Sequence, residues 1–153
     1  MNGDEDMPDV THRASARKGR DEFVKVTARN HTITIDEPIE KGGTDTGMNP
    51  VEMLLGSIAA CLTLTISIYA EAMGVNVEDI RVDVEGDLNS AGMKGSARVR
   101  PGFNRIRPHI TVKTDVAPEM FQQVIDLAVL RCPVEDSVSK GVEFDEPCVT
   151  IEK

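Results

Sequence analysis

Three cysteines, Cys61, Cys132 and Cys148, are the residues of this 153-residue chain best suited to nucleophilic or redox chemistry. A thiolate is a nucleophile and a metal ligand, whereas a buried thiol can simply pack as a small apolar group. Three thiols cannot all pair within one chain, and they show no CxxC spacing, so we expect no structural zinc site. The choice is therefore between redox-active thiols and inert packing.

A pair of thiols suits the reduction of a peroxide. The attacking thiol must ionise, so a cation or hydrogen-bond donors must lower its pKa. It also needs apolar surroundings for an oily substrate, and a second thiol that attacks the sulfenic acid before further oxidation. Cys61 and Cys132 lie far apart in the sequence, so only the fold can bring them together. Composition and spacing alone favour structural cysteines.

Composition and charge exclude several other classes of function. The length suits one domain, and 40% hydrophobic residues are normal for a globular protein. The net charge of −9 argues against nucleic acid or an anionic membrane surface as a partner. The start of the chain lacks the pattern of a secretory signal, and the apolar stretch 51–73 is interrupted by Glu52 and Glu71. We expect no membrane span and a cytoplasmic protein with reduced thiols.

The first third of the chain predicts a tail, a hairpin and a loop. Residues 1–21 are polar and predict a flexible tail. Alternating apolar residues over 23–35 predict a β-hairpin that turns near Arg29. The glycine-rich segment 41–50 predicts a loop, and it lacks the spacing of a phosphate-binding loop.

A long helix is predicted from Asn49 to Met73. Asn49 suits the N-cap, Glu52 occupies the place of the capping-box acid, and Gly74 suits a helix end. Apolar residues cover most of the circumference, so the helix must be enclosed on nearly all sides. One small domain can hardly enclose it, whereas a second subunit would help.

The rest of the chain predicts strands, then two helices, then a last strand. We predict a strand over 80–88, two strand segments over 96–115, helices over 118–131 and 133–141, and a final strand over 142–153. With the hairpin and the long helix, this order indicates an α+β domain with mainly antiparallel pairing.

Two separated motifs carry a resemblance to a known family. The stretch "GGTDTGMNPVEMLLGSIAACLTLTISIYAEAMG" at 42–74 is followed by "RCPVEDSVSKGV" at 131–142, and "ITIDEP" at 33–38 precedes both. In this order, and with both thiols in place, they resemble the OsmC/Ohr family (osmotically inducible protein C-like and organic hydroperoxide resistance proteins), in its OsmC-like branch. The resemblance covers residues 22–153, which we expect to form an OsmC-like domain.

The resemblance implies a fold and an activity. The fold is α+β, with antiparallel sheets around a long central helix in an intertwined homodimer with shared active sites. The activity is thiol-dependent reduction of organic hydroperoxides, and possibly of hydrogen peroxide, in oxidative stress defence. Cys61 matches the cysteine that attacks the peroxide and Cys132 the resolving cysteine. An external dithiol would restore both thiols, and no metal or organic cofactor is implied.

The arginine and the acid of the family's site are less clear in this chain. Arg29 lies where the family arginine tends to lie, or it is an exposed turn residue. The organic-hydroperoxide branch places its acid ten residues before the cysteine, where this chain has Val51. Glu52 falls nine before Cys61, on the opposite side of the helix. Glu52 therefore reaches a thiol only across the dimer, or it is a helix cap, which we favour.

Two other functions stay open. A dimer without enzymatic activity would bind an apolar small molecule at its interface, and a purely structural dimer would keep inert thiols. Apolar residues expected near Cys61 favour bulky organic peroxides for the enzyme; they are Met53, Leu55, Ile58, Leu62 and Phe121. Cys148 has no counterpart in the family and is predicted to pack in the last strand.

Overall fold

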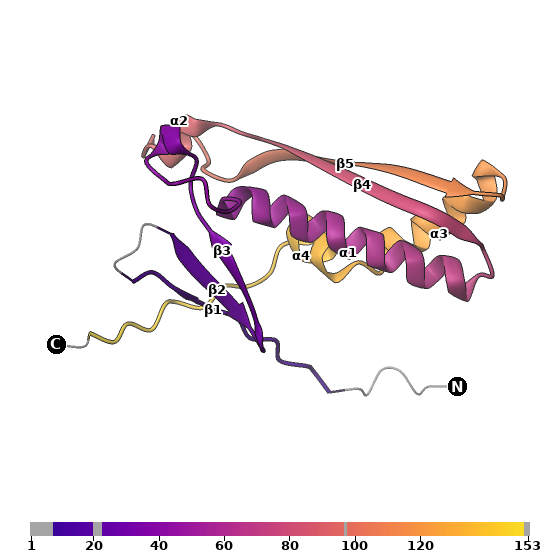
Figure 1. The fold of residues 1–153 in the computed structure, drawn as a ribbon, viewed down its shortest axis with the longest axis horizontal. Helices are drawn as coiled ribbons and strands as arrows, with labels where there is room; N and C mark the ends of the chain where they lie inside the picture. The colour runs from indigo at the N-terminus through magenta and orange to yellow at the C-terminus, as the bar shows by residue number, and fades with distance from the viewer. Residues whose placement is uncertain (1–7, 20–22, 97, 152–153) are drawn as a thin grey trace. The chain divides into compact units, whose positions relative to one another are not determined.

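The computed structural model describes residues 8–19, 23–96 and 98–151, in two compact units divided after Met53. Both contain antiparallel sheet, and a long helix begins near the division, so the predicted α+β class, with antiparallel sheets and a long helix, is confirmed (Figure 1). Residues 1–7, 20 and 21 of the predicted tail, and residue 22 of the predicted domain, lie outside the described residues.

The first unit contains a three-stranded antiparallel sheet in the order β1–β2–β3. Its strands are β1 (Ser15–Arg17), β2 (Val24–Ala28) and β3 (His31–Ile35). Ala28 pairs with His31, which confirms the predicted hairpin and its turn at Arg29. The sequence analysis missed β1 and placed its residues in the tail. Its three exposed residues carry no apolar alternation, and only pairing with β2 makes them a strand.

A buried carboxylate organises the loop that follows β3. Asp36 is only 4% exposed, and its Oδ2 accepts hydrogen bonds from the backbone N–H and the hydroxyl of both Thr44 and Thr46. Its Oδ1 accepts from the N–H of Glu37 at 2.8 Å. The hydroxyl of Thr44 and the N–H of Thr46 hold the pKa of Asp36 well below its usual range. The loop, which includes the 3-10 helix η1 (Ile39–Lys41), is thus closed around an ionised side chain.

Helix α1 (Pro50–Ala72) begins and ends as the sequence predicts. The Asn49 side chain accepts from the N–H groups of Val51 and Glu52 at 3.0 and 2.9 Å, and Glu52 accepts from the Asn49 N–H at 2.8 Å. This reciprocal pair is a capping box and confirms the capping role of Glu52. At the other end Gly74 has φ +68°, and its N–H and that of Val75 donate back to the last turn of the helix.

The second unit is built on a two-stranded antiparallel ribbon that runs along α1 (Figure 1). Its strands are β4 (Val77–Leu88) and β5 (Phe103–Thr114), and the short helix α2 (Ser90–Met93) lies between them in the chain. Two strand segments were expected over 96–115, but the structure has one long strand there. Pairing with the equally long β4 keeps β5 continuous through Pro108, which lies opposite Val84.

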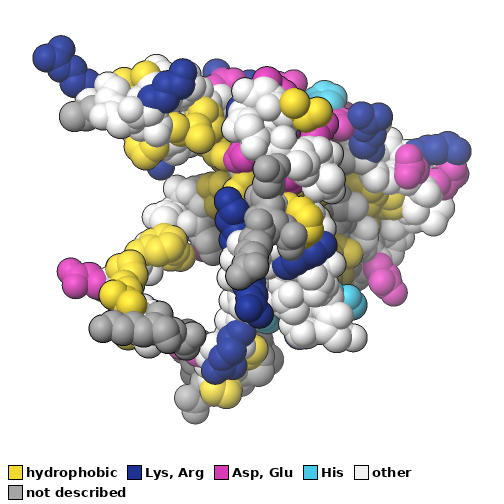
Figure 2. All heavy atoms as spheres, turned by 60° about the vertical axis from the view of Figure 1, so that its left-hand side comes forward, with side chains coloured by type: hydrophobic (Ala, Val, Ile, Leu, Met, Phe, Trp, Pro, Cys, Tyr) yellow, Lys and Arg dark blue, Asp and Glu magenta, His cyan; other side chains and the backbone are white. Residues whose placement is uncertain are grey.

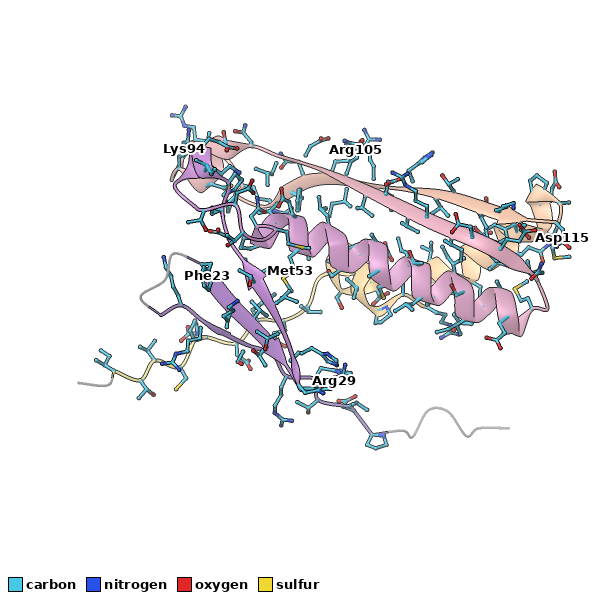
Figure 3. The ribbon with its side chains drawn as sticks, viewed as in Figure 1. Phe23, Arg29, Met53, Lys94, Arg105 and Asp115 are labelled. Carbon is cyan, nitrogen blue, oxygen red and sulfur yellow. The ribbon has the colours of Figure 1, made fainter. Side chains whose placement is uncertain are left out.

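The two faces of this ribbon differ in polarity. Between the two register shifts of the ribbon, apolar residues with even numbers, including Val82 and Ile110, pack against the core. The odd-numbered positions of this stretch carry charges that pair across the strands, as Arg107 does with Asp87 and Glu85. Figure 3 shows Arg105 on the side of the ribbon away from α1. This alternation fixes the register, because a slip of one residue would bury the charged face.

Helices α3 (Pro118–Leu130) and α4 (Pro133–Lys140) complete the second unit, as predicted. The main core joins α1 to α3; its buried members are Ile66, Ala70, Val75, Phe121, Val124 and Ala128. Partly buried side chains of β4 and β5 pack against it. By length and composition α1 would also be able to cross a membrane, although core helices of soluble proteins share these properties; 22% of its most apolar window is buried in this structure.

The predicted final strand does not form in the described part, residues 142–151. A strand needs a partner for its backbone groups, and none of the described strands pairs with this segment. Its apolar side chains are open to solvent, with Phe144 89% and Ile151 83% exposed. Cys148 is exposed as well, so the prediction that it packs in a strand is wrong.

Candidate functional site

The fold brings Cys61 and Cys132 into one apolar cluster. The cluster is centred on the buried side chains of Ile58, Leu62 and Cys132. Partly buried side chains pack around these three; they are Cys61, Val82, Val84, Ile106 and Val134. The two thiols, which the sequence separates widely, therefore share an environment made by α1, α4 and both long strands.

Local structure places each thiol. Cys61 lies in the middle of α1, on the face that carries Ile58 three residues earlier. Cys132 is the N-cap of α4, and Pro133 is the first residue of that helix. A residue before proline avoids helical backbone angles, so α3 must end before Cys132. The break between the two helices thus points a thiol back at α1.

The two thiols differ in accessibility. Cys61 is partly exposed, whereas Cys132 is fully buried. Both are free thiols, and Cys132 lies close enough to Cys61 to raise the pKa of its thiol. A molecule arriving from solvent can therefore reach Cys61 first, and Cys132 is placed to react with whatever Cys61 becomes.

The surroundings of Cys61 raise the pKa of its thiol. Burial is the largest cause, because the apolar cluster disfavours a charge, and the neighbouring Cys132 thiol raises the pKa of Cys61 further. Two groups act in the opposite direction: the backbone N–H of Val134 and the hydroxyl of Thr65 both lower the pKa. The described surroundings thus favour a protonated Cys61, with two donors ready for a thiolate.

Arg29 lies at the tip of the β2–β3 hairpin, where Figure 3 labels it. It is exposed, and its φ of +55° is in the left-handed region. A side chain that is not glycine rarely adopts this conformation, because Cβ crowds the following carbonyl oxygen. Arg29 belongs to the first unit and Cys61 to the second, and its role at the thiol stays a prediction.

Two further expectations are settled by the described contacts. Glu52 is engaged with the N–H of Asn49 as a cap, as favoured above. Phe121 lies in the main core with Ile66 and not in the cluster of the thiols, so it does not flank Cys61 as expected. The helix α3 carries it away from the N-terminus of α4.

Sequence reasoning missed Thr65 and the N–H of Val134 as neighbours of the thiol. Thr65 follows Cys61 by four residues, so helical periodicity already places it on the same face. Val134 follows Cys132 by two residues, but its approach to Cys61 depends on the packing of α4 against α1. Only the first of the two neighbours had a signal in the sequence.

A family model described as OsmC-like protein matches residues 43–146, which include both thiols. The chain belongs to the OsmC-like family. The uncharacterised protein YmaD of Bacillus subtilis (strain 168) is 27% identical over 128 residues, which are 82% of this chain and 83% of YmaD.

Solved structures of OsmC-like proteins share the fold. An OsmC-like protein from Mycoplasma pneumoniae superposes with a TM-score of 0.74 at 21% identity, over 86% of this chain and 89% of that one. An organic hydroperoxide resistance protein OsmC from Legionella pneumophila superposes with a TM-score of 0.64 at 22% identity, over 88% of this chain and 93% of that one. At this identity the likeness shows the fold alone.

Proposed function

We propose that this OsmC-like protein is a thiol peroxidase that reduces organic hydroperoxides through Cys61 and Cys132. The observation that carries the proposal is the pair of free thiols in one apolar cluster, with one thiol accessible and the other buried. Support also comes from the name of the Legionella pneumophila relative, an organic hydroperoxide resistance protein. The apolar lining from Ile58 and Leu62 suits the organic group of such a substrate.

The reaction proceeds in three balanced steps. The Cys61 thiolate attacks the distal oxygen of ROOH and the O–O bond breaks, so Cys61 becomes a sulfenic acid. The alkoxide that leaves takes up the proton that the thiol released and departs as ROH. The Cys132 thiol attacks the sulfenic sulfur, an S–S bond forms, and water leaves. An external dithiol then reduces this disulfide by thiol exchange and is itself oxidised. The partial exposure of Cys61 supports giving it the first step, because the substrate must reach the attacking sulfur.

A homodimer would complete the site. Proteins of the OsmC/Ohr family are commonly homodimers. In this chain, α1 exposes Leu64 and Ile68 at 65% and 59%, and hydrophobic side chains reach the surface in Figure 2. A second copy that covers these residues would enclose the thiols, and either copy would supply Arg29. The domain in this proposal spans residues 22–153 and works in the cytoplasm.

The test is stopped thiol counting after cumene hydroperoxide is added to the reduced protein. We expect rapid loss of two thiols per chain and a Cys61–Cys132 disulfide in peptide maps. The Cys132→Ser variant should stop at the sulfenic acid, and the Cys61→Ser variant should not react. Cys148→Ser is the matched control, in which the thiols of Cys61 and Cys132 should both still be lost. Thiols that persist at the rate of free cysteine would rule out the enzyme.

A second candidate is a dimer that binds an apolar small molecule and catalyses nothing. The raised pKa of Cys61 favours it, since a protonated thiol is a poor nucleophile. In that case a hydrophobic fluorescent dye should bind with a fixed stoichiometry per dimer, and cumene hydroperoxide should leave Cys61 reduced. Absence of dye binding, combined with rapid loss of thiols after cumene hydroperoxide is added, would favour the peroxidase.

A further inference from the structure

Thr65 has a buried hydroxyl directly beside the thiol of Cys61. It is 9% exposed and lies one helical turn after Cys61 in α1. Its hydroxyl donates a hydrogen bond to the Cys61 carbonyl oxygen. A threonine hydroxyl in a helix commonly donates to the carbonyl four residues earlier. The same hydroxyl lowers the pKa of the Cys61 thiol, which places it near the sulfur as well.

The carbonyl oxygen of Cys61 does not depend on this bond. In an α-helix it also accepts the backbone N–H four residues later, which is that of Thr65. The hydroxyl can therefore turn away without leaving a buried acceptor unsatisfied, and its rotation about the Cβ–Oγ1 bond needs no movement of the helix. A sulfur that gains a negative charge is the stronger acceptor, because hydrogen bonds to ions exceed those to neutral groups.

The N-terminus of α4 approaches the same sulfur. Cys132, its N-cap, makes no side-chain capping bond, and Pro133 has no N–H. The first N–H of the helix is therefore that of Val134, which faces the Cys61 thiol. Among the described residues, Cys132 is the ionisable group whose charge acts on the Cys61 thiol. Ile58, Leu62 and the strand residues of the cluster add no charge.

We propose that Thr65 is a further catalytic residue, whose hydroxyl moves its hydrogen bond from the Cys61 carbonyl to the Cys61 sulfur when the thiol ionises. The inference rests on the proposed peroxidase function. It gives the Cys61 thiolate a hydrogen-bond donor from within α1. Together with the Val134 N–H, the hydroxyl gives the thiolate two donors in a cluster that is otherwise apolar. The donor set lies wholly within residues of the second unit.

The ionisation of Cys61 can be measured without any peroxide. The full chain is alkylated with iodoacetamide over a range of pH, and mass spectrometry follows the peptide that carries Cys61. Thr65→Val removes the hydroxyl at nearly constant shape and should lower the alkylation rate at pH 7 about tenfold, as expected for one hydrogen bond to an ion. Thr65→Ser should restore the rate to within about twofold.

Thr63→Val is the matched control. Thr63 donates to the Ala59 carbonyl at 2.9 Å in the same helix, but it follows Cys61 by two residues and so faces another side of the helix. Thr65→Ala provides a second test should the valine variant fail to fold. A Thr65→Val or Thr65→Ala profile that superposes on that of the native chain, or an equal shift in Thr63→Val, overturns the role of Thr65. If the shift appears while cumene hydroperoxide leaves Cys61 reduced, Thr65 holds the thiolate and the peroxidase proposal alone fails.

Discussion

Replacing Arg29 by glycine should separate stability from function at the hairpin turn. The left-handed conformation, at φ +55°, costs a residue with a Cβ about 1–2 kcal/mol. Glycine removes this cost but loses about 0.5–1 kcal/mol of backbone entropy on folding. The free energy of unfolding should therefore rise by about 0.5–1 kcal/mol. For a domain of this size that corresponds to a Tm increase of about 1–4 °C.

The same substitution should impair the chemistry if Arg29 serves Cys61. A cation beside a thiol lowers its pKa by about 1–3 units, so its loss should slow cumene hydroperoxide reduction at pH 7 about 10-fold or more. Differential scanning calorimetry gives the Tm, and thiol counting gives the rate. The expected result is a variant that is more stable and less active.

Asp45→Gly is the matched control, because Asp45 also has φ +55°. It should gain similar stability and keep its activity. Unchanged activity in Arg29→Gly would make Arg29 an exposed turn residue and refute its role at the thiol. A lower Tm in both variants would refute the strain argument itself.

Two other substitutions test the packing of the ribbon and the loop. Gly86→Ala should cost about 1–3 kcal/mol in denaturant unfolding, because its Cβ would lie 2.4 Å from Cε1 of Phe103, whereas Gly19→Ala meets nothing within 4 Å and should change little. Asp36→Asn should destabilise the chain most above about pH 5. The folded carboxylate has a lowered pKa, so its contribution is present above the unfolded value near 4 and is lost as the pH falls below it. Urea unfolding midpoints of the native chain and of Asp36→Asn, measured from pH 2 to 7, check this prediction. A difference between the two midpoints that grows toward low pH would contradict it.

Local patterns in the sequence were enough for much of the fold. The capping box at Asn49 and Glu52, the helix end at Gly74 and the hairpin turn at Arg29 each depend on neighbours within a few residues. Such short-range chemistry is written directly in the order of the residues. For the same reason the helical position of Thr65 relative to Cys61 was available from the sequence, although its hydroxyl was overlooked.

Contacts between distant segments were the part that the sequence left open. Strand β1 exists only because β2 pairs with it, and the segment around Phe144 stays without a strand partner in the described chain. Helical periodicity also did not predict that Phe121 packs in the main core and not beside the thiols. In each case the outcome depends on which surfaces meet, and that is a property of the whole chain.

The sequence by itself determined the family of this protein, the long apolar helix that carries Cys61, and the proline break that carries Cys132. Only the tertiary structure decided that the two thiols share one apolar cluster, that Cys61 is the accessible one, and that its pKa is raised. The physical reason is that exposure and pKa are set by the atoms that surround a group. For Cys61 those atoms come from α1, α4 and both strands of the ribbon, which meet only in the folded chain.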